Sequence, residues 1–485
     1  MSHEDASHAR ARLFRKLAAV ARPPRQKELE LLDALYARAA SDRASVPRNR
    51  FLGMHAHTAS RRTLHHVDPD GYAHYKVDGV AAQAAWVTAS RTAQREPPPR
   101  WGVADAAADA ADTGIELYGR ADTVLLVLRD GSTHAVDMCA LPARKNGRTL
   151  LDGELCLRAR RLSADAKERL AEWANSPRFE PAPLDPDDGD ATRDADYELC
   201  FAAHDCIVAD SWQQTKAKSK RVAPPVAASR YEERLRALAE RTKPRLGDAA
   251  ALETARRLAD ALLAAGRTEL PLRVFAKQPL PLHKLELMAR CLPRALVGVR
   301  TDGLVLMGDA APYVAGTCAT LLRVKWQHTV DLRLQADADG APRFYVVDRR
   351  EPLPCAGLHC GADRAAYELA QRAHAANQAA DDAALFVEHE AAEARGLVLE
   401  FAPHIEPAAR AALDALPIRD AAPATLLARV APLVAWTPVL ARAEKRAPNS
   451  LATFCGVLEA LAWPCTLADI GAHARTQSEQ AQQQQ

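Results

Sequence analysis

The residues with the clearest chemical potential form a tetrapeptide, Lys76-Val77-Asp78-Gly79, at the end of the run GYAHYKVDG. A lysine amine is a good nucleophile only when it is neutral, so its reference pKa of about 10.4 would have to fall. Burial and neighbouring cations can produce that fall. Taken alone, the tetrapeptide reads more readily as a solvated strand end followed by a turn, because motifs this short often arise by chance. Its meaning depends on the residues that follow it.

Groups suited to phosphate chemistry follow at a distance along the chain. Asp152, Glu154 and Asp302 are acids at expected strand ends. Arg323 and Lys325 alternate on one expected strand, so both point to the same face. Two such carboxylates can hold a Mg²⁺ or Mn²⁺ ion that keeps most of its waters and bridges a nucleotide phosphate. Together these groups predict attack of the lysine on the α-phosphate of a nucleoside triphosphate, catalysed by positioning and charge neutralisation.

Length and composition bound the class of protein. The chain has 485 residues, more than one ordinary core accommodates, so two domains or more are expected. Its 64 basic and 62 acidic residues give a net charge of +2, so any nucleic-acid-binding surface must be local. No apolar run is long enough to span a bilayer, and the N-terminus lacks the apolar segment of a signal peptide.

The ten cysteines contain no repeated Cys-x-x-Cys pair, which predicts an intracellular, reducing compartment. For a cellular protein we expect the nucleus, and for a viral one a nuclear or cytoplasmic replication site. Four cysteines in apolar runs are expected to be small core residues: Cys200, Cys206, Cys291 and Cys455.

Hydrophobic patterning predicts four regions and an α+β fold with antiparallel or mixed sheets. The regions are a charged N-terminal helical arm (1–44), a first domain (45–326), a smaller β-domain (327–470) and a disordered Gln-rich tail (471–485). The chain from residue 48 to the lysine strand is expected to be irregular. Further strands are expected over residues 80–88, 114–118, 123–128, 149–156, 197–208, 270–280, 299–307, 320–326, 344–347, 384–387 and 396–401. Helices are expected over residues 28–36, 231–241, 248–265, 285–291 and 450–463.

Short motifs follow one another in a particular order along residues 51–470. They are FLG at 51–53 and HTAS at 57–60, KVDG at 76–79, TLLDGEL at 149–155, HD at 204–205, FAK at 275–277, TDGLV at 301–305, GT at 316–317, LLRVK at 321–325 and TVD at 329–331. In this order they resemble the motifs of the mRNA-capping guanylyltransferases, which belong to the covalent nucleotidyltransferase superfamily with the DNA and RNA ligases. TLLDGEL is the most family-specific piece.

The resemblance implies a two-domain architecture. The first domain would be an ATP-grasp-like nucleotidyltransferase domain with antiparallel or mixed sheets. The second would be an OB-fold β-barrel that opens and closes over the first as a lid. The stretch from Trp436 through Arg442, Glu444 and Lys445 to Asn449 resembles the motif that orients the β- and γ-phosphates from this lid.

The resemblance also implies roles for individual residues. Lys76 would take GMP from GTP as a covalent lysyl-N-GMP, and Glu154 and Asp302 would bind the metal ion. The 5′-diphosphate end of RNA would then accept the GMP and form a GpppN cap. The nucleotide-binding residues implied are Lys76, Asp78, Glu154, His204, Lys277, Arg323, Lys325, Asp331, Arg442 and Lys445.

Several positions depart from the family pattern. Ala81 stands where the family often has a ribose-binding arginine, and His204 replaces a phenylalanine that stacks on the base. Arg323 replaces a lysine, a change that keeps the charge but not the shape. In the lid motif Leu440 stands for an arginine and Glu444 for an aspartate. Since the lysine and the acids remain, we expect an active but divergent enzyme.

Two other functions stay open. The first is an ATP-dependent RNA or DNA ligase of the same superfamily, which TLLDGEL, the TVD at 329–331 and the C-terminal lid speak against. The second is a degenerate nucleotidyltransferase that binds RNA or a polymerase and forms no covalent adduct. Because the N-terminal arm is too short for a domain, we expect the RNA triphosphatase and the cap methyltransferase on separate chains. The C-terminal tail of RNA polymerase is a further expected partner.

Overall fold

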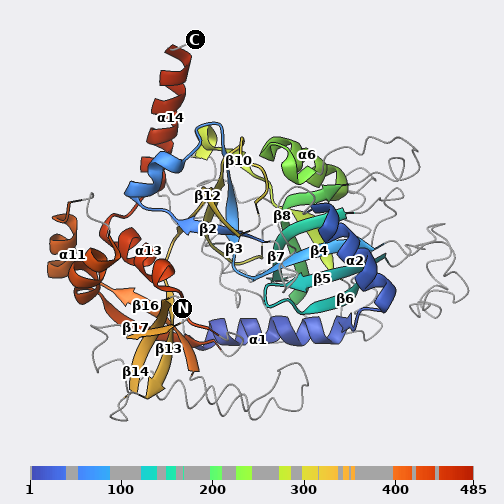
Figure 1. Ribbon diagram of the computed structural model, residues 1–485, viewed down its shortest axis with the longest axis horizontal. Coiled ribbons are helices and arrows are strands. Elements are labelled where there is room, and N and C mark those ends of the chain that lie inside the picture. Colours follow the sequence, from blue (N-terminus) through green and yellow to red (C-terminus); the bar gives the residue numbers. More distant parts are fainter. Residues whose placement is uncertain are drawn as a thin grey trace, which may run out of the picture.

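The computed structural model describes residues 3–39, 53–87, 122–138, 149–159, 168, 197–209, 226–242, 272–285, 298–314, 316–336, 342–348, 351–354, 397–417, 422–442 and 447–483. The described strands form three sheets, with helices packed against them (Figure 1). The predicted α+β class with antiparallel and mixed sheets is confirmed.

The first sheet has seven strands in the order β1-β6-β5-β4-β7-β8-β9. All neighbours are antiparallel except β8 and β9, which are parallel. Successive residues of β5 alternate between two core clusters, so both faces of the sheet are buried. The strands are Ala21–Arg22 (β1), Val80–Val87 (β4), Asp122–Leu128 (β5), Thr133–Met138 (β6), Thr149–Ala159 (β7), Tyr197–Ala209 (β8) and Arg273–Ala276 (β9).

Two N-terminal helices cover opposite faces of this sheet (Figure 1). Leu13 and Leu17 of α1 (His3–Val20) pack on one face, and Leu32, Leu35 and Tyr36 of α2 (Gln26–Ala39) pack on the other. The apolar spacing at 28–36 therefore marks a buried face. The N-terminal segment is helical as predicted, but these two helices are part of the core of the first sheet rather than a separate arm.

The second sheet has the order β10-β3-β11-β12-β2, with only β12 and β2 parallel. Its centre is β11, where Gly303 lies opposite Lys76 of β3 on one side and opposite Lys325 of β12 on the other. Gly303 has a φ of 156°, and a Cβ there would stand 2.1 Å from the Val324 carbonyl oxygen, so only glycine fits. The strands are Met54–Thr58 (β2), Tyr72–Val77 (β3), Leu280–Pro281 (β10), Thr301–Met307 (β11) and Gly316–Lys325 (β12).

The third sheet is antiparallel, with the order β15-β14-β13-β16-β17. Five strands in one sheet are the content of an OB-fold barrel. Its core includes Phe344, Phe401 and Trp436, and α13 (Leu451–Ala462) closes it with Phe454. Ser450 caps α13 by accepting a hydrogen bond from the Thr453 amide. The strands are Val330–Ala336 (β13), Pro342–Asp348 (β14), Glu351–Pro354 (β15), Leu397–His404 (β16) and Ala435–Ala441 (β17).

The last helix, α14 (Leu467–Gln483), returns from the third sheet to the second. Its residues Leu467, Ile470 and Ala474 join the apolar cluster of β3, β11 and β12. In Figure 1 the rest of α14 projects away from the body and ends near the C-terminus. The Gln-rich tail predicted to be disordered is thus helical through Gln483, because apolar residues at helical spacing anchor the helix that leads into it.

The remaining helical segments are shorter. They are Arg61–His66 (η1), Val226–Ala228 (η5), Tyr231–Thr242 (α6), Leu282–Lys284 (η6), Pro407–Asp414 (α11), Pro423–Thr425 (α12), Leu426–Val430 (η8) and Ala431–Leu433 (η9). Among the described helices, none alone has the length and apolarity to cross a bilayer, and α13 with α14 passes that test only as a pair bent by 89°.

Most predicted elements within the described residues are confirmed. The irregular segment expected before the lysine strand is wrong in part, because β2 pairs in parallel with β12. Besides β2, five described strands were not predicted: β1, β6, β13, β15 and β17. β1 and β15 are too short to give a pattern, whereas β13 (VDLRLQA) alternates apolar and polar residues throughout. The expected elements at 114–118, 248–265 and 384–387 lie outside the described residues, as does the expected helix at 285–291 except for Leu285. Cys200, Cys206 and Cys455 are buried and free as expected, and Cys291 lies outside the described residues.

Candidate nucleotidyl-transfer site

The centre of the site is an ion pair between Lys76 and Asp302. The Lys76 ammonium donates to both carboxylate oxygens of Asp302, at 2.8 Å to Oδ1 and 2.9 Å to Oδ2. Lys325 Nζ lies 3.8 Å from the same Oδ2. The three side chains are 20–24% exposed, so water and a ligand can reach them. One carboxylate is therefore shared by two ammonium groups, which leaves the cluster with a net positive charge.

The pKa of Lys76 is raised, contrary to the fall expected from the sequence. Burial alone would lower the pKa of this ammonium, but the carboxylates of Asp302, Glu154 and Asp78 together outweigh burial. In the free protein Lys76 is therefore protonated and held by Asp302. A nucleophilic amine requires that this ion pair open first.

The two cations of β12 differ from Lys76 in the sign of their shift. Burial is the largest cause that lowers the pKa of Lys325, and the charges of Lys76 and Arg323 add to it. Burial also lowers the pKa of Arg323, whose Nε donates to Thr58 Oγ1 at 3.2 Å. Crowding of positive charge destabilises the charged forms of these side chains, and a bound anion would relieve it.

Glu154 and Lys277 form a second ion pair next to the first. Lys277 Nζ lies 3.3 Å from Glu154 Oε2, and its side chain is only 1% exposed. The pair is held by adjacent strands, because Ala202 of β8 lies opposite Glu154, and the Lys277 amide donates to the Ala203 carbonyl. Since Glu154 is among the charges that raise the pKa of Lys76, the two pairs belong to one region.

Asp78 forms an ion pair with Arg300, with Oδ2 3.1 Å from Nε. Its amide also donates to the Arg300 carbonyl, so the turn after β3 is fixed to the segment that enters β11. Asp78 thus positions the strand that carries Lys76 as well as adding negative charge near it.

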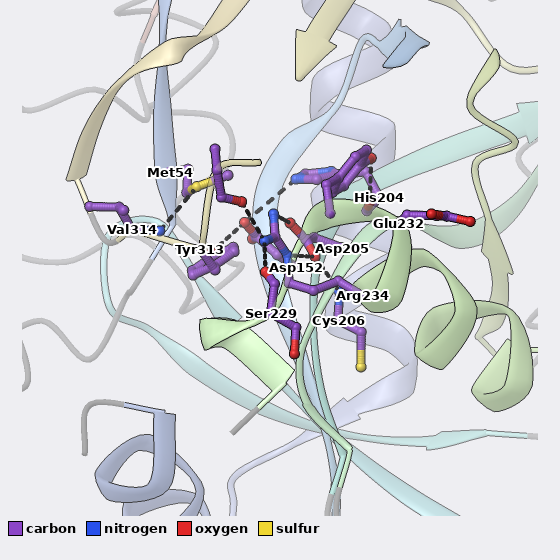
Figure 2. Close-up of polar contacts among 12 residues, drawn as sticks. Met54, Asp152, His204, Asp205, Cys206, Ser229, Glu232, Arg234, Tyr313 and Val314 are labelled. Atoms are coloured by element: carbon purple, nitrogen blue, oxygen red, sulfur yellow. Dashed lines mark hydrogen bonds and ion pairs between the residues drawn. The ribbon is translucent and has the colours of Figure 1, made fainter. Parts of the chain in front are cut away.

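His204 faces Asp152, with its Nε2 3.5 Å from Oδ2 (Figure 2). The same carboxylate oxygen accepts a hydrogen bond of 2.5 Å from the Tyr313 hydroxyl. Burial is the largest cause that raises the pKa of Tyr313, with the charge of Asp152 next, so the phenol stays protonated and donates. Asp152 therefore fixes the orientation of the His204 ring.

The neighbouring carboxylate Asp205 has a different role. Arg234 donates to it from Nε at 2.9 Å and from Nη2 at 3.1 Å, and both side chains are fully buried (Figure 2). Arg234 Nη1 donates to the carbonyls of Ser229 and Ala311, which ties α6 to the loop after β11. This pair is saturated with protein partners and supports the sheet beneath His204.

Two predicted lid residues, Asp331 and Arg442, lie in or beside the third sheet. Arg442 Nη1 is 3.3 Å from Asp331 Oδ1 and 2.6 Å from Glu400 Oε2. Asn449 Oδ1 accepts from the Asp331 amide. These residues form a cluster of their own, and Lys445 and Glu444 lie outside the described residues.

Glu400 links this third-sheet cluster to Lys325 of β12. Burial would raise its pKa, but the charge of Arg442, a hydrogen bond to Thr329 and the charge of Lys325 lower it to about 2. Sequence reasoning missed Glu400, since a lone acid within an apolar strand carries no motif. It also missed His74, although His74 stands two residues before Lys76 and so shares its strand face.

A cavity of about 210 Å³ borders Lys325 on the side of the third sheet. It lies between the end of β12 and the end of α13, and its lining includes Lys325, Trp326, His328, Leu461 and Cys465. Burial, with the charges of Lys325 and Arg323, lowers the pKa of His328 to about 4, so the His328 ring is neutral.

The acids suit a metal ion only in the presence of a nucleotide. Among the described residues, no group of three or more His, Cys, Asp or Glu side chains could hold an ion. Mg²⁺ is commonly bound by one or two carboxylates together with substrate phosphates. Asp302 and Glu154 fit that pattern, since each now holds a lysine that a cation could replace.

Comparisons with known proteins give distant likenesses. No protein-family model matches the sequence, and no curated protein matches it. Among solved structures the chain is similar to a mycobacterial DNA ligase D complexed with ATP, at 14% identity and a TM-score of 0.30, covering 74% of this chain and 91% of that one. A second is the ligase domain of M. tuberculosis LigD, at 15% identity and a TM-score of 0.26, with coverages of 74% and 91%. A third is the ATP-dependent DNA ligase of bacteriophage T7 with ATP, at 11% identity and a TM-score of 0.25, with coverages of 74% and 95%. Because these TM-scores lie below 0.5, we base the function on this chain's own residues.

Proposed function

We propose that the chain is a covalent nucleotidyltransferase that moves GMP from GTP through Lys76 to the 5′-diphosphate end of RNA. The observation that carries the proposal is the Lys76 ammonium on Asp302, with Lys325 on the same carboxylate. The motif order around these residues supports the choice of GTP and RNA.

In the first step the Lys76 amine attacks the α-phosphorus of GTP. A P–N bond forms, the bond from the α-phosphorus to the bridging oxygen breaks, and pyrophosphate leaves with the electron pair. In the second step a β-phosphate oxygen of the RNA end attacks the same phosphorus. The P–N bond then breaks, and Lys76 takes up a proton as it leaves.

Before the first step Lys76 must lose a proton. The Asp302 oxygens at 2.8 and 2.9 Å are within reach of it. Once Asp302 no longer balances Lys76, burial and the nearby positive charge of Lys325 both favour the neutral amine.

The other cations would hold the phosphates. Arg323 and Lys325 would neutralise the oxygens of the α-phosphate, and Arg442 and Lys445 would act on the β- and γ-phosphates. A bound Mg²⁺ or Mn²⁺, held by Asp302 and Glu154, would supply charge neutralisation at the phosphates. His204 and Lys277 would contact the base.

The test is intact-mass analysis after incubation with Mg²⁺ and either GTP or ATP. We expect an adduct of one GMP on the wild type and none on Lys76→Ala. The matched control is Lys284→Ala, a lysine that is exposed in η6, which should keep the adduct. Treatment of the isolated adduct with diphosphate-ended RNA should release the GMP into a cap.

Each alternative has its own outcome. An adduct with ATP but not GTP would replace the proposal by a ligase-type adenylyltransferase, and sealing of nicked nucleic acid would then be measured. No adduct with either triphosphate would support a binding scaffold. We further propose that a triphosphatase on another chain supplies the diphosphate end and a methyltransferase consumes the cap, with the polymerase C-terminal tail as a docking partner.

A further inference from the structure

Arg129 stands in the turn that joins β5 to β6, beside β4 in the first sheet (Figure 1). Its guanidinium is exposed and forms no ion pair or side-chain hydrogen bond within the described part of the chain. By contrast, the nearby Lys277 is paired with Glu154. An exposed arginine is ordinary in itself, so the meaning of Arg129 depends on where its charge lies.

The turn that carries Arg129 is held by its own hydrogen bonds. The Gly131 amide donates to the Leu128 carbonyl at 2.8 Å, and Gly131 has a φ of 89°, which glycine adopts readily. The Asp130 carboxylate accepts from the Ser132 amide at 2.8 Å and from the Ser132 hydroxyl at 2.7 Å. The acid next to Arg129 is therefore engaged within the turn, and the guanidinium stays available to a ligand.

The backbone ladder between β4 and β5 continues as far as Arg129. Ala82 lies opposite Leu128 in this ladder. The Arg129 amide donates to the Ala81 carbonyl at 3.2 Å, so Arg129 lies opposite Ala81. Ala81 in turn lies opposite Glu154 of β7. Since residues opposite one another in antiparallel strands project from the same face, Arg129 shares the face of the first sheet that bears Glu154.

The middle of this row is small. Ala81 contributes only a methyl group between the two charged residues at its ends. Two strand spacings put the backbone of Arg129 about 10 Å from that of Glu154. The long side chain of Arg129 therefore has room above Ala81 to approach the proposed site.

The charge of Arg129 reaches Arg323 of β12. Burial is the largest cause that lowers the pKa of Arg323; the Asp302 carboxylate opposes burial, and Arg129 adds to the lowering. Arg323 is thus within electrostatic range of both Asp302 and Arg129. Together with Lys76 and Lys325, the two arginines outnumber Asp302, and this excess of positive charge suits a polyanion.

The two steps of the proposed reaction place phosphates differently. The attacking and leaving oxygens lie roughly in line through the reacting phosphorus, so the RNA diphosphate enters on the side from which pyrophosphate left. An RNA chain must then continue outward, whereas GTP ends at its γ-phosphate. Arg323 and Lys325 are half-buried and suit the compact nucleotide, while the exposed Arg129 at the edge suits the entering chain.

We propose that Arg129 binds the 5′-phosphates of the RNA acceptor. This inference rests on the proposed function and deepens it, because it names a residue that serves the second step. The arginine fork matches two oxygens of one phosphate and donates to both. Because phosphates carry no sequence information, this contact positions the RNA end whatever its bases are.

The two half-reactions test the inference separately. The isolated lysyl-GMP adduct is treated with diphosphate-ended RNA below saturation, and adduct formation from GTP is measured on the same proteins. Arg129→Ala should slow transfer to RNA about tenfold or more, since it removes a charged hydrogen bond. It should change adduct formation by less than about threefold. Arg129→Lys should recover part of the transfer, because it keeps the charge without the fork.

The matched control is Arg236→Ala, which removes an exposed arginine of α6 and should change neither half-reaction. If Arg129→Ala fails to fold, the same measurements on Arg129→Gln replace it. Equal slowing of both half-reactions would assign Arg129 to the GTP phosphates, and unchanged transfer to RNA would assign it to neither substrate. Either result would overturn the inference while the adduct itself upholds the proposed function.

Equilibrium binding gives a readout that does not depend on catalysis. The wild type should bind an RNA oligonucleotide with a 5′-diphosphate more tightly than the same oligonucleotide with a 5′-hydroxyl. Arg129→Ala should lose most of this preference and reduce the salt dependence of binding by about one released ion. No adduct, or an adduct with ATP alone, would contradict the proposed function, and the binding preference would still decide the role of Arg129.

Discussion

Asp302 and Asp205 each accept two hydrogen bonds from one cation, yet the two pairs are built for different purposes. Asp205 and Arg234 are fully buried, and Arg234 Nη1 donates to two main-chain carbonyls. Asp302 and Lys76 are 24% and 20% exposed, and a second ammonium, that of Lys325, competes for the same carboxylate. The charges of Asp205 and Arg234 balance each other. The Asp302 site carries one more positive than negative charge, which a bound polyanion can neutralise.

A carboxylate that accepts two hydrogen bonds from one cation can therefore belong either to a functional site or to the structural core. What distinguishes the two is whether all hydrogen-bonding capacity is used within the chain and whether water reaches the pair. A buried and saturated pair resists removal of either partner, whereas an accessible and overcharged one can exchange partners. The predictions below place the two pairs under matched changes.

Removal of each aspartate should give opposite results. Asp205→Ala leaves the Arg234 charge buried without a partner, and we expect a loss of about 3–5 kcal/mol in the free energy of unfolding. Asp302→Ala should change that energy by less than about 2 kcal/mol, because its lysines reach water, while lysyl-GMP formation falls about a hundredfold or more. Denaturant unfolding and intact-mass kinetics on both variants measure the contrast. Equal destabilisation by the two substitutions would remove the distinction.

A third carboxylate, Glu400, extends the comparison to acid pH. Its pKa in the folded protein is about 2, below its ordinary value of 4.5, so it stabilises the fold above pH 4.5 and loses that contribution as pH falls towards 2. The loss amounts to about 3 kcal/mol at most. Unfolding measured between pH 5 and pH 2 should show a steeper decline for the wild type than for Glu400→Gln. Parallel curves would contradict this ion-pair contribution.

Arginine-to-lysine changes should separate the buried Asp205 pair from Arg323, a cation on the strand that also carries Lys325. Arg234→Lys loses the fork that reaches Asp205 and two carbonyls, and we expect a cost of about 2 kcal/mol. Arg323→Lys keeps the charge near the phosphates and loses one hydrogen bond to Thr58, so stability should change by less than about 1 kcal/mol and activity by less than about tenfold. Thermal unfolding and adduct formation are the measurements. A larger stability loss at Arg323 would show that its role is structural.

The smallest expected effect is at the uncharged cap of α13, which belongs to neither pair. Ser450→Ala removes the cap of α13 and should cost about 1 kcal/mol without changing adduct formation. Ser450→Gly is the matched control and should cost only a few tenths of that, because glycine is tolerated at this position. A cost for glycine as large as for alanine would show that the serine side chain acts through some other contact.

The sequence predicted the strands that carry the site more successfully than the electrostatics within it. Runs of apolar and β-branched residues located β4, β5, β7, β8, β11 and β12, because those strands are buried on both faces. The acids and cations on them were found through motifs. The raised pKa of Lys76 was not predicted, since it depends on three carboxylates contributed by different strands or turns.

The sequence by itself determined that a lysine, two acids and two cations lie at strand positions suited to phosphate chemistry. Tertiary structure alone decided that Lys76 and Lys325 lie on either side of Gly303 and share one carboxylate. A glycine in the sequence indicates that another part of the chain comes close, but it does not identify which residues do. Tertiary structure also decided the different roles of two neighbouring carboxylates. Asp205 is paired with the buried Arg234, whereas Asp152, which lies opposite Asp205 on β7, orients His204. Tertiary contacts likewise decided that α14 folds back on the second sheet. The physical reason is that hydrogen-bond saturation and charge balance depend on neighbours distant in the chain, whereas periodicity and motif spacing are local.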